Sequence, residues 1–389
     1  MRARSLILGG NFLCAIHYAL VIYALSPYLA TFMEQKYIGL VFAFGAVLTL
    51  LSFPLVPRVV EKFGGRTILV ALAVLTFLTL LCLVVLPIPI IAILLVAILC
   101  SVQPFFTYLL DVLLETTISS EEETGRARAL YMSIGNLAFV SAPFITGIIL
   151  GPEDAYHMLF IVSAVTLIPF TLLFLRLRTH ETRPKHVHGL GAVLHCLLKD
   201  PDMRSVLIAN ATLQFFYHLA PFYIPLYLHT VLQIPWTELG WMFTVMLLPF
   251  VLLEYPVGWL ADKKVGDREL MALGFLIMGG SFAAIAFVTS ETALSALLIT
   301  LVLTRVGASM VEATAEGHFF RKVSSVDANS VGILRMTRPV SAVLAPLTAS
   351  IMLMFTSYSI FFLLLGLFIV CVGVASALSV RDIPQLGSA

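Results

Sequence analysis

Charged residues are scarce in this chain of 389 residues. Asp, Glu, Lys and Arg make up 12% of it and hydrophobic residues 60%, whereas a soluble domain carries about 25% charged residues. A soluble protein cannot hide that much apolar surface, because its exterior has to be wetted. The composition therefore excludes a soluble enzyme, a nucleic-acid-binding protein and a disordered chain, and it predicts a polytopic membrane protein. The net charge of +1 provides no strong field for nucleic acid.

Cysteine is sparse as well, and no metal site or cofactor is expected from its spacing. The five cysteines, Cys14, Cys82, Cys100, Cys196 and Cys371, form no CxxC pair, and we interpret them as small buried residues. The chain also lacks a GxxxxGK[ST] loop, so ATP is not expected to drive it. No cleavable signal peptide is expected, because the apolar run after Ser5 is long enough to be the first span.

Twelve apolar runs divide the chain. Each is long enough to cross the hydrocarbon core as a helix, which takes about 20 residues, and none shows the dyad alternation of a membrane barrel. The runs cover residues 5–30, 37–57, 67–87, 89–115, 127–150, 155–176, 204–230, 237–260, 269–289, 292–319, 328–354 and 357–379. The predicted fold is an all-α membrane protein of twelve transmembrane helices, monomeric and surrounded by the lipid bilayer.

The distribution of Lys and Arg predicts the orientation. With both termini in the cytoplasm, 19 of the 23 Lys and Arg residues fall in cytoplasmic segments, and Lys36 is the exception outside. The other three, Arg305, Arg335 and Arg338, lie within spans. We therefore expect a multi-pass protein of the cytoplasmic (inner) membrane.

One longer loop separates two groups of six spans. It runs over residues 177–203, so the predicted domains are a bundle at 1–176, a cytoplasmic linker at 177–203 and a bundle at 204–389. His186 and His188 beside Cys196 leave a metal site as an alternative for this loop. We favour a linker with a short surface helix.

The two halves repeat several features at an offset of about 200 residues. The segment Pro57–Arg66 after the second span corresponds to Gly258–Arg268 after the eighth. The other corresponding features are Asp111 and Glu115 with Glu312 and Glu316, Ser141-Ala142-Pro143 with Ser341 and Ala345-Pro346, and Asn11, His17 and Tyr18 with Asn210, Tyr217 and His218. A duplicated six-span unit is typical of secondary transporters, which bind their solute between the halves.

Over nearly its full length the chain resembles the major facilitator superfamily. The resemblance rests on the loop motif G-x-L-x-D-x-x-G-R-R, which Gly258–Arg268 follows with one extra residue before Gly266. The first copy departs, with Pro57 in place of Gly and Glu61 in place of Asp. The resemblance implies two six-helix bundles that rock about a central cavity and move a small-molecule substrate by alternating access.

The loop motif also supplies candidate gate residues. An acid at the inner end of a helix can face the positive N-terminus of another helix, and a following Arg can pair with an acid of span four or ten. The candidates are Glu61, Lys62, Gly64, Arg66, Gly258, Asp262, Lys263, Gly266 and Arg268, with Asp111, Glu115, Glu312 and Glu316 as partners. The alternative is that these charges only set the topology.

Ionisable residues inside spans are candidates for coupling, because each costs at least about 2.5–3.5 kcal/mol at mid-helix. They are Glu254, Arg305, Glu312, Glu316, Arg335 and Arg338. We expect Glu312 to pair with Arg335 or Arg338, either as a structural lock or with a role in proton coupling or in binding a charged group of the substrate. Span four has no Arg or Lys, although proton-coupled exporters of the superfamily often carry an Arg there, and this weighs against proton antiport.

The fifth span favours export over import. Ala138-x-x-x-Ala142-Pro143-x-x-Thr146-Gly147 resembles the G-x-x-x-G-P-x-x-G-G signature of the superfamily's exporters, with Ala at both glycine positions before Pro. The expected function is proton-coupled efflux by a secondary active transporter, and a proton-coupled importer is the alternative.

The predicted cavity is lined by polar residues of spans one, four, five, seven and ten. They are Asn11, His17, Tyr18, Gln103, Thr107, Tyr108, Asn136, Gln214, Tyr217, His218 and Arg305. Each is also suited to bonding one helix to another. An enzyme is not expected, because the short loops offer only Glu121-Glu122-Glu123, and a membrane-embedded enzyme or a non-transporting sensor remains the rival class.

Overall fold

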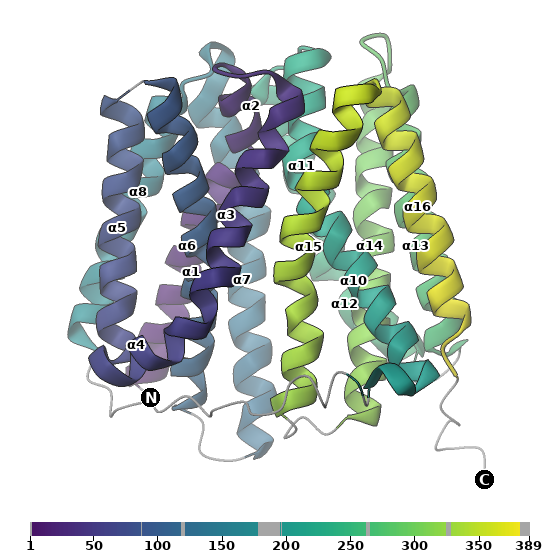
Figure 1. Cartoon of the computed structure of the whole chain (residues 1–389), viewed down its shortest axis with the longest axis horizontal. Coiled ribbons are helices and arrows are strands. Elements are labelled where there is room, and N and C mark those ends of the chain that lie inside the picture. The colour runs from purple at the N-terminus through teal and green to yellow at the C-terminus, as the bar shows by residue number, and fades with distance from the viewer. Residues whose placement is uncertain are drawn as a thin grey trace. The chain divides into compact units, whose positions relative to one another are not determined.

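The structure is a computed structural model and describes residues 2–86, 88–117, 121–177, 195, 197–261, 265–323 and 328–381. Within these ranges every regular element is a helix (Figure 1). The metal alternative at His186, His188 and Cys196 lies outside the described residues.

In the residues that the structure describes, the first half of the chain contains six helical spans, two of them interrupted. They are α1 (Arg2–Ile22) with α2 (Leu25–Ala30), α3 (Ile38–Ser52) with α4 (Val56–Phe63), α5 (Gly65–Val85), α6 (Pro89–Glu115), α7 (Glu121–Leu150) and α8 (Tyr156–Arg176). The short 3₁₀ turn η2 (Phe53–Leu55) separates α3 from α4. Pro54 lies in this turn, and a proline removes one N–H from the helical ladder.

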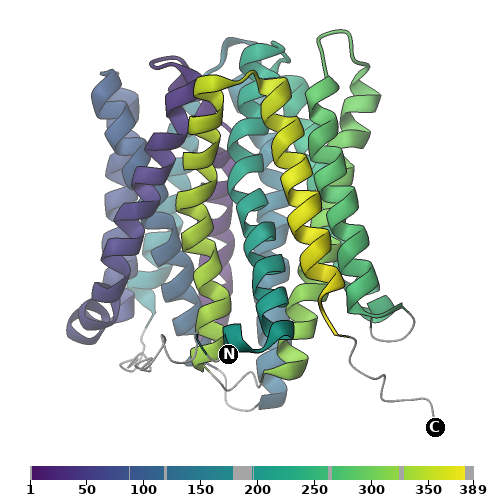
Figure 2. The ribbon, with the colours of Figure 1, turned by 45° about the vertical axis from the view of Figure 1, so that its right-hand side comes forward.

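The second half repeats this plan. It contains α10 (Pro201–Pro225) with the π-helical turn η4 (Leu226–Val231), α11 (Trp236–Leu252) with α12 (Glu254–Leu260), α13 (Asp267–Ala284), α14 (Leu294–Lys322), α15 (Ala328–Phe355) and α16 (Tyr358–Leu378). The eighth span is interrupted like the second one, here at Leu253. Figure 2 shows α15 and α16 as antiparallel neighbours.

The fold class is confirmed as all-α and membrane-spanning. In the described part of the chain, eleven helices are long and apolar enough to cross a membrane. The twelfth is α10, which is 25 residues long but carries Asn210, Gln214 and His218 in its middle. These polar side chains lower its mean hydropathy, which explains why the seventh span is less apolar than the others. Side chains such as Leu51, Val85 and Phe355 are 70–83% exposed, as expected for surfaces that face lipid.

Contacts divide the chain into two compact units. Unit 1 comprises Met1–His186 and Pro221–Thr244, and unit 2 comprises Val187–Ala220 and Val245–Ala389. The segment 221–244 covers the end of α10, η4 and the beginning of α11, so part of the seventh and eighth spans packs with the amino-terminal helices. The predicted domain limits at 176 and 204 stay a prediction.

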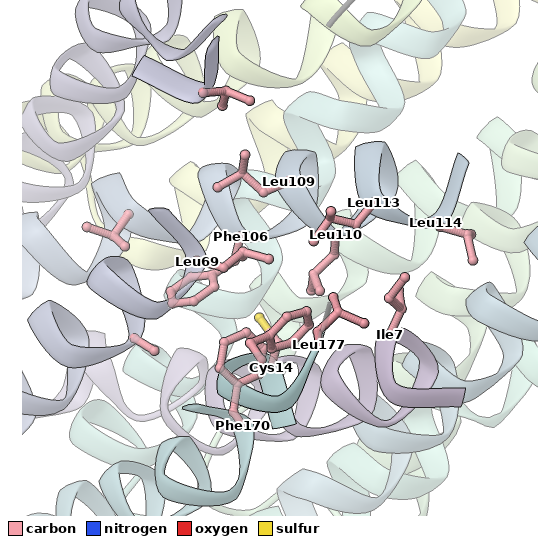
Figure 3. Packing of buried hydrophobic residues seen from close by; sticks show 14 residues of the cluster. Ile7, Cys14, Leu69, Phe106, Leu109, Leu110, Leu113, Leu114, Phe170 and Leu177 are labelled. Atoms are coloured by element: carbon pink, nitrogen blue, oxygen red, sulfur yellow. The ribbon is translucent and has the colours of Figure 1, made fainter. Parts of the chain in front are cut away.

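The core of unit 1 is a cluster of Leu and Phe side chains shared by α1, α5, α6 and α8 (Figure 3). Phe106 meets Phe170 edge-to-face with 5.5 Å between ring centroids. Gly10 on α1 lets Phe174 approach, because a Cβ at this position would lie 2.4 Å from the Phe174 ring. Large side chains on one helix thus fit against a small residue on the next.

In unit 2, α13 packs against both α14 and α16, and glycines make the approach close. A Cβ at Gly307 of α14 would lie 2.4 Å from the backbone nitrogen of Met278, and one at Gly366 of α16 would lie 2.5 Å from Ala283. Close backbone approach through small residues is the usual means of helix association in membranes, where lipid tails are as apolar as the side chains.

Candidate functional site

The first copy of the loop motif forms the turn between α4 and α5. Gly64 adopts φ +80° there, a conformation that favours glycine. Glu61 and Lys62 are exposed on α4, and the Lys62 ammonium lies 5.1 Å from the centroid of the Phe63 ring. Arg66 donates to the carbonyl of Leu175 at 2.5 Å. The last carbonyls of a helix have no partner within it, so Arg66 ties the start of α5 to the end of α8.

The acid at the end of α6 has a different partner from the one expected. Glu115 pairs with Arg128 of α7, with 2.5 Å between Oε1 and Nη2. The predicted pairing of Arg66 with an acid of span four is therefore replaced by two contacts inside unit 1, Arg66 with Leu175 and Glu115 with Arg128. Asp111 lies one turn before Glu115 and is half-buried.

The second copy of the motif leads into α13. Gly258 lies in α12, and Gly266 adopts φ +95° just before α13 begins, as Gly64 does before α5. Arg268 is half-buried in the first turn of α13. Asp262 and Lys263 lie outside the described residues. The two glycines at matching positions support the interpretation of these loops as a repeated motif.

The intramembrane acid Glu312 lies on α14 and faces α10. Its Oε2 accepts a hydrogen bond of 2.7 Å from the hydroxyl of Tyr217. Glu254, Glu316 and Arg338 are near enough for their charges to act on Glu312. The expected ion pair with an Arg of span eleven is thus replaced by a bond to Tyr217, with Arg338 as a more distant countercharge. Arg335 and Arg338 are exposed on α15.

Arg305 is buried in the middle of α14, with 2% of its surface exposed. Its guanidinium carbon lies 5.0 Å from the centroid of the Phe216 ring on α10. A cation over an aromatic face is stabilised by the ring quadrupole. This geometry favours a structural contact between α10 and α14 for Arg305.

The polar candidates of unit 1 bond one helix to another. Asn11 donates to the carbonyl of Tyr131 on α7 at 2.8 Å, and His17 is buried with Nδ1 2.7 Å from the Ser163 hydroxyl on α8. Tyr18 lies edge-on to the ring of Phe139, and the amide nitrogen of Gln103 lies 3.9 Å from the sulfur of Cys14. The rings of Tyr108 and Phe53 have 5.3 Å between their centroids, and Asn136 is half-buried on α7. For Asn11 and His17 helix packing is the favoured role, because both are buried and bonded.

In unit 2, Gln214 and His218 lie one turn apart on α10. Gln214 is buried, and its carbonyl lies 2.7 Å from Nδ1 of His218. Asn210, one turn earlier, donates to the Thr337 hydroxyl on α15 at 2.7 Å. Among these candidates, Tyr217 is the one that contacts an intramembrane acid.

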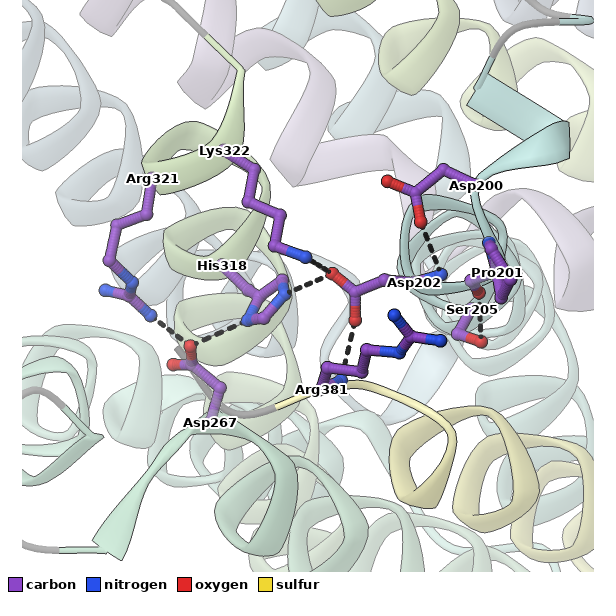
Figure 4. Close-up of polar contacts among 9 residues, drawn as sticks. All are labelled: Asp200, Pro201, Asp202, Ser205, Asp267, His318, Arg321, Lys322 and Arg381. Carbon is purple, nitrogen blue, oxygen red and sulfur yellow. Dashed lines mark hydrogen bonds and ion pairs between the residues drawn. The ribbon is translucent and has the colours of Figure 1, made fainter. Parts of the chain in front are cut away.

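A buried ionic cluster in unit 2 was missed by the sequence analysis (Figure 4). His318 of α14 lies between two carboxylates, with Nδ1 3.0 Å from Asp267 of α13 and Nε2 3.0 Å from Asp202 of α10. Arg321 also bonds Asp267, and Lys322 bonds Asp202. The backbone N–H of Arg381 donates to Asp202 at 2.6 Å.

The cluster follows from the charges at the helix ends. Asp202 and Asp267 lie in the first turns of α10 and α13, where the helix dipole favours an anion. Arg321 and Lys322 lie in the last turn of α14, where it favours a cation. An imidazole facing two carboxylates satisfies both only when it carries both protons. The cluster joins the ends of α10, α13 and α14 with the segment after α16.

Comparison with known proteins decides the family. The family model of the Major Facilitator Superfamily matches residues 7–240 and again residues 206–388. The chain belongs to the major facilitator superfamily. The two matches together span almost the whole sequence, and each of them contains one copy of the motif loop.

Solved transporters of the superfamily fold share the architecture. The nucleoside transporter NupG, in a mutant form, superposes with a TM-score of 0.78 at 14% identity, over 96% of this chain and 98% of its own. An auto-inhibited peptide transporter of the POT family gives 0.77 at 14% identity, over 100% and 99%. An inward-facing bacterial homologue of the iron transporter ferroportin gives 0.72 at 13%, over 97% of both chains. Comparison with curated proteins finds no match.

These findings establish the general function. The chain is a multi-pass integral membrane protein and a secondary transporter of the superfamily, which moves small molecules across the membrane and is not an enzyme. At 13–14% sequence identity, these similarities show that the fold is shared. They do not identify the solute of this protein. Charged and polar side chains inside the membrane-spanning helices meet between α10 and α14, where Tyr217 contacts Glu312 and Phe216 contacts Arg305.

Proposed function

We propose that the protein is a proton-coupled exporter of a small solute and that Glu312 carries the coupling proton. The observation that carries the proposal is the bond between Tyr217 of α10 and Glu312 of α14. Spans seven and ten belong to the set from which the cavity is expected to be lined. A proton at Glu312 would therefore be exchanged where the solute binds.

The surroundings of Glu312 make a change of charge there consequential. Two further acids, Glu254 and Glu316, lie within electrostatic range, and Arg338 is the nearby cation. When the carboxylate is charged, the Tyr217 hydroxyl donates to it. When the carboxyl is protonated, it can donate a bond itself, and the repulsion among the three acids falls. The contact between α10 and α14 thus depends on whether a proton is bound.

Export is the proposed direction because of the small residues of α7. Ala142 is fully buried, and a Cβ at Gly147 would lie 2.6 Å from the carbonyl of Trp236 and 2.8 Å from Gly240 of α11. This close crossing agrees with the resemblance of span five to the exporters' signature. The lack of Lys and Arg in α6 favours the alternative, a proton-coupled importer.

The loop glycines Gly64 and Gly266 support a gate at the inner ends of the spans. Both hold the chain in a tight reversal next to a charged residue, Arg66 in one half and Arg268 in the other. We place this side in the cytoplasm with both termini, in the inner membrane of a monomeric protein, as the distribution of Lys and Arg indicates.

Infrared difference spectroscopy tests the coupling site without a known solute. A pH jump applied to the purified protein should produce a carboxyl C=O band that is missing in Glu312→Gln and retained in Glu291→Gln, a matched change in an exposed turn. A band of equal size in Glu312→Gln would reassign the proton to another group.

A further inference from the structure

Unusual backbone conformations gather at one end of unit 1. Asp154 (φ 52°) and Gln233 (φ 56°) are the non-glycine residues with positive φ in the described part of the chain. Asp154 follows α7, Gln233 precedes α11, and the π-helical turn η4 lies between α10 and α11. Left-handed non-glycine residues and π-turns are costly, and they concentrate at sites that bind or switch.

A histidine lies where these segments meet. Nε2 of His229, in η4, is 3.0 Å from Oδ2 of Asp154, and its Nδ1 is 3.0 Å from the carbonyl of Ile234. The ring packs on Trp236 with 4.9 Å between centroids. Its side chain is 14% exposed and that of Asp154 is 42% exposed, so protons from the medium can reach the pair.

The geometry makes this contact dependent on a proton. Both ring nitrogens of His229 face oxygen atoms that can only accept, and only an imidazole that carries both protons donates to both. When one proton leaves, a lone pair faces either the Asp154 carboxylate or the Ile234 carbonyl, and one of the two bonds is lost. Histidine is the residue type whose charge changes between about pH 5 and pH 8.

We propose that His229 and Asp154 form a proton-dependent latch, which holds the ends of the seventh and eighth spans against the amino-terminal helices on the outer side. In the latched form His229 carries a proton on both ring nitrogens, and in the released form it has lost one of them. A low pH outside the membrane therefore favours the latched form. Alkaline pH outside favours release. The latch rests on the proposed orientation with cytoplasmic termini, and it does not depend on proton coupling at Glu312.

The other contacts of the segment 221–244 with the amino-terminal helices do not change their charge. Ser26 donates to the carbonyl of Phe222 at 2.5 Å, Phe42 stacks on Phe222 with 3.9 Å between centroids, and Gln35 donates to Thr230 at 2.9 Å. They hold the segment equally at any pH. Any pH dependence in how segment 221–244 is held against the amino-terminal helices therefore comes from the latch.

The remaining titratable groups on the elements packed there offer no second switch of this kind. Glu34 and Lys36 pair with each other at 2.6 Å, Glu238 accepts from Trp241 at 2.8 Å, and phenols keep their proton between pH 5.5 and pH 8. The groups are Glu34 and Lys36 beside Gln35, Tyr28 on α2, Glu153 before α8, Tyr156 and His157 on α8, Tyr227 on η4 and Glu238 on α11. His157 is exposed and serves as the matched control.

Thiol labelling from outside tests the latch in intact proteoliposomes. The reporter is Ser26→Cys in a protein whose five native cysteines are replaced by serine, because Ser26 is fully buried and its hydroxyl bonds the carbonyl of Phe222. A membrane-impermeant maleimide is applied at outer pH 5.5 and pH 8. Labelling of Glu291→Cys, in an exposed turn, corrects for the effect of pH on the thiol reaction.

The corrected labelling should rise about two- to fivefold from pH 5.5 to pH 8, the range expected for a partly exposed ion pair. His229→Gln should remove this slope, and His157→Gln should keep it. Equal labelling at both pH values, or an undiminished slope in His229→Gln, would overturn the proposal. Glu312→Gln should leave the slope unchanged, so a failure of proton coupling and a failure of the latch are told apart.

A second readout needs no change at the latch itself. With Trp241→Phe and Trp259→Phe, Trp236 is the remaining tryptophan, and a protonated imidazole on its face quenches indole emission. Emission should fall as the pH is lowered from 8 to 5.5. If it stays constant while His229 and Asp154 are intact, the ring does not gain a proton there and the latch is refuted.

Discussion

His318 has to satisfy two carboxylates at once, and its burial leaves no water to replace either bond. Asp202 and Asp267 would face each other without a cation between them if the imidazole were removed, since Arg321 and Lys322 each reach only one of them. Breaking a buried charge cluster by removing one member is far more costly than the net contribution of the intact cluster. His318 is therefore the side chain that links the two ion pairs, Arg321 with Asp267 and Lys322 with Asp202.

His318→Ala should lower the free energy of unfolding by about 3–5 kcal/mol, because two buried carboxylates lose their shared partner. The midpoint of thermal unfolding in detergent measures the effect. Glu269→Gln is the control, an exposed acid in the same turn of α13 as Asp267. Equal midpoints for His318→Ala and Glu269→Gln would contradict the role of His318.

The proposed role of Glu312 in transport depends on its ability to gain and lose a proton. Glu312→Gln keeps the size and the bond to Tyr217 but cannot bind a proton. In a His229→Gln background, which lacks the latch, transport should then lose its dependence on pH, while Glu291→Gln in the same background keeps it. Solute flux at several pH values, with the same protein content per vesicle, provides the measurement, and a pH profile unchanged by Glu312→Gln would rule out this residue.

The individual helices follow from the sequence more fully than their contacts do. The apolar runs predict the spans, and the repeated motif predicts that Gly64 and Gly266 occupy matching positions in two loops between spans. The partner of Arg66 was not predictable, because it is a backbone carbonyl at the end of α8. The ionic cluster was missed because His318 lies 51 residues from Asp267 and 116 from Asp202. The available signal was an acid at two helix starts and two bases at the end of α14.

At the scale of the helix pair, the crossing of α7 and α11 depends on two glycines. Gly147→Ala adds a methyl group 2.6 Å from the Trp236 carbonyl, which is backbone and cannot move aside easily. We expect a loss of stability of about 1–3 kcal/mol from this overpacking. Gly280→Ala is the control, because a Cβ there meets nothing within 4 Å. Thermal unfolding compares the two, and an equally stable Gly147→Ala protein would contradict the close crossing.

For the whole molecule, the family and the fold are established by two matches that together span nearly the whole chain, and the orientation is argued from charge. The twelve spans were predictable because membrane helices must be long and apolar, and because Lys and Arg alternate across them. The grouping of residues 221–244 with unit 1 was not predictable, since it depends on contacts between segments far apart in the sequence.

The orientation can be checked with a single thiol at each end. In cells whose membrane is intact, an impermeant maleimide should label Glu291→Cys at once and Ser388→Cys only after the membrane is opened. The opposite order would reverse the topology and place the proposed latch on the cytoplasmic side.

The most direct measurement follows protons and solute together in sealed vesicles that contain the purified protein and an internal pH dye. Solutes that raise the thermal stability of the protein in a screen are added without ATP. The account predicts that a solute which moves across the membrane drives protons in the opposite direction, and that Glu312→Gln abolishes this proton movement. Solute movement with no change in internal pH in the unaltered protein would contradict it.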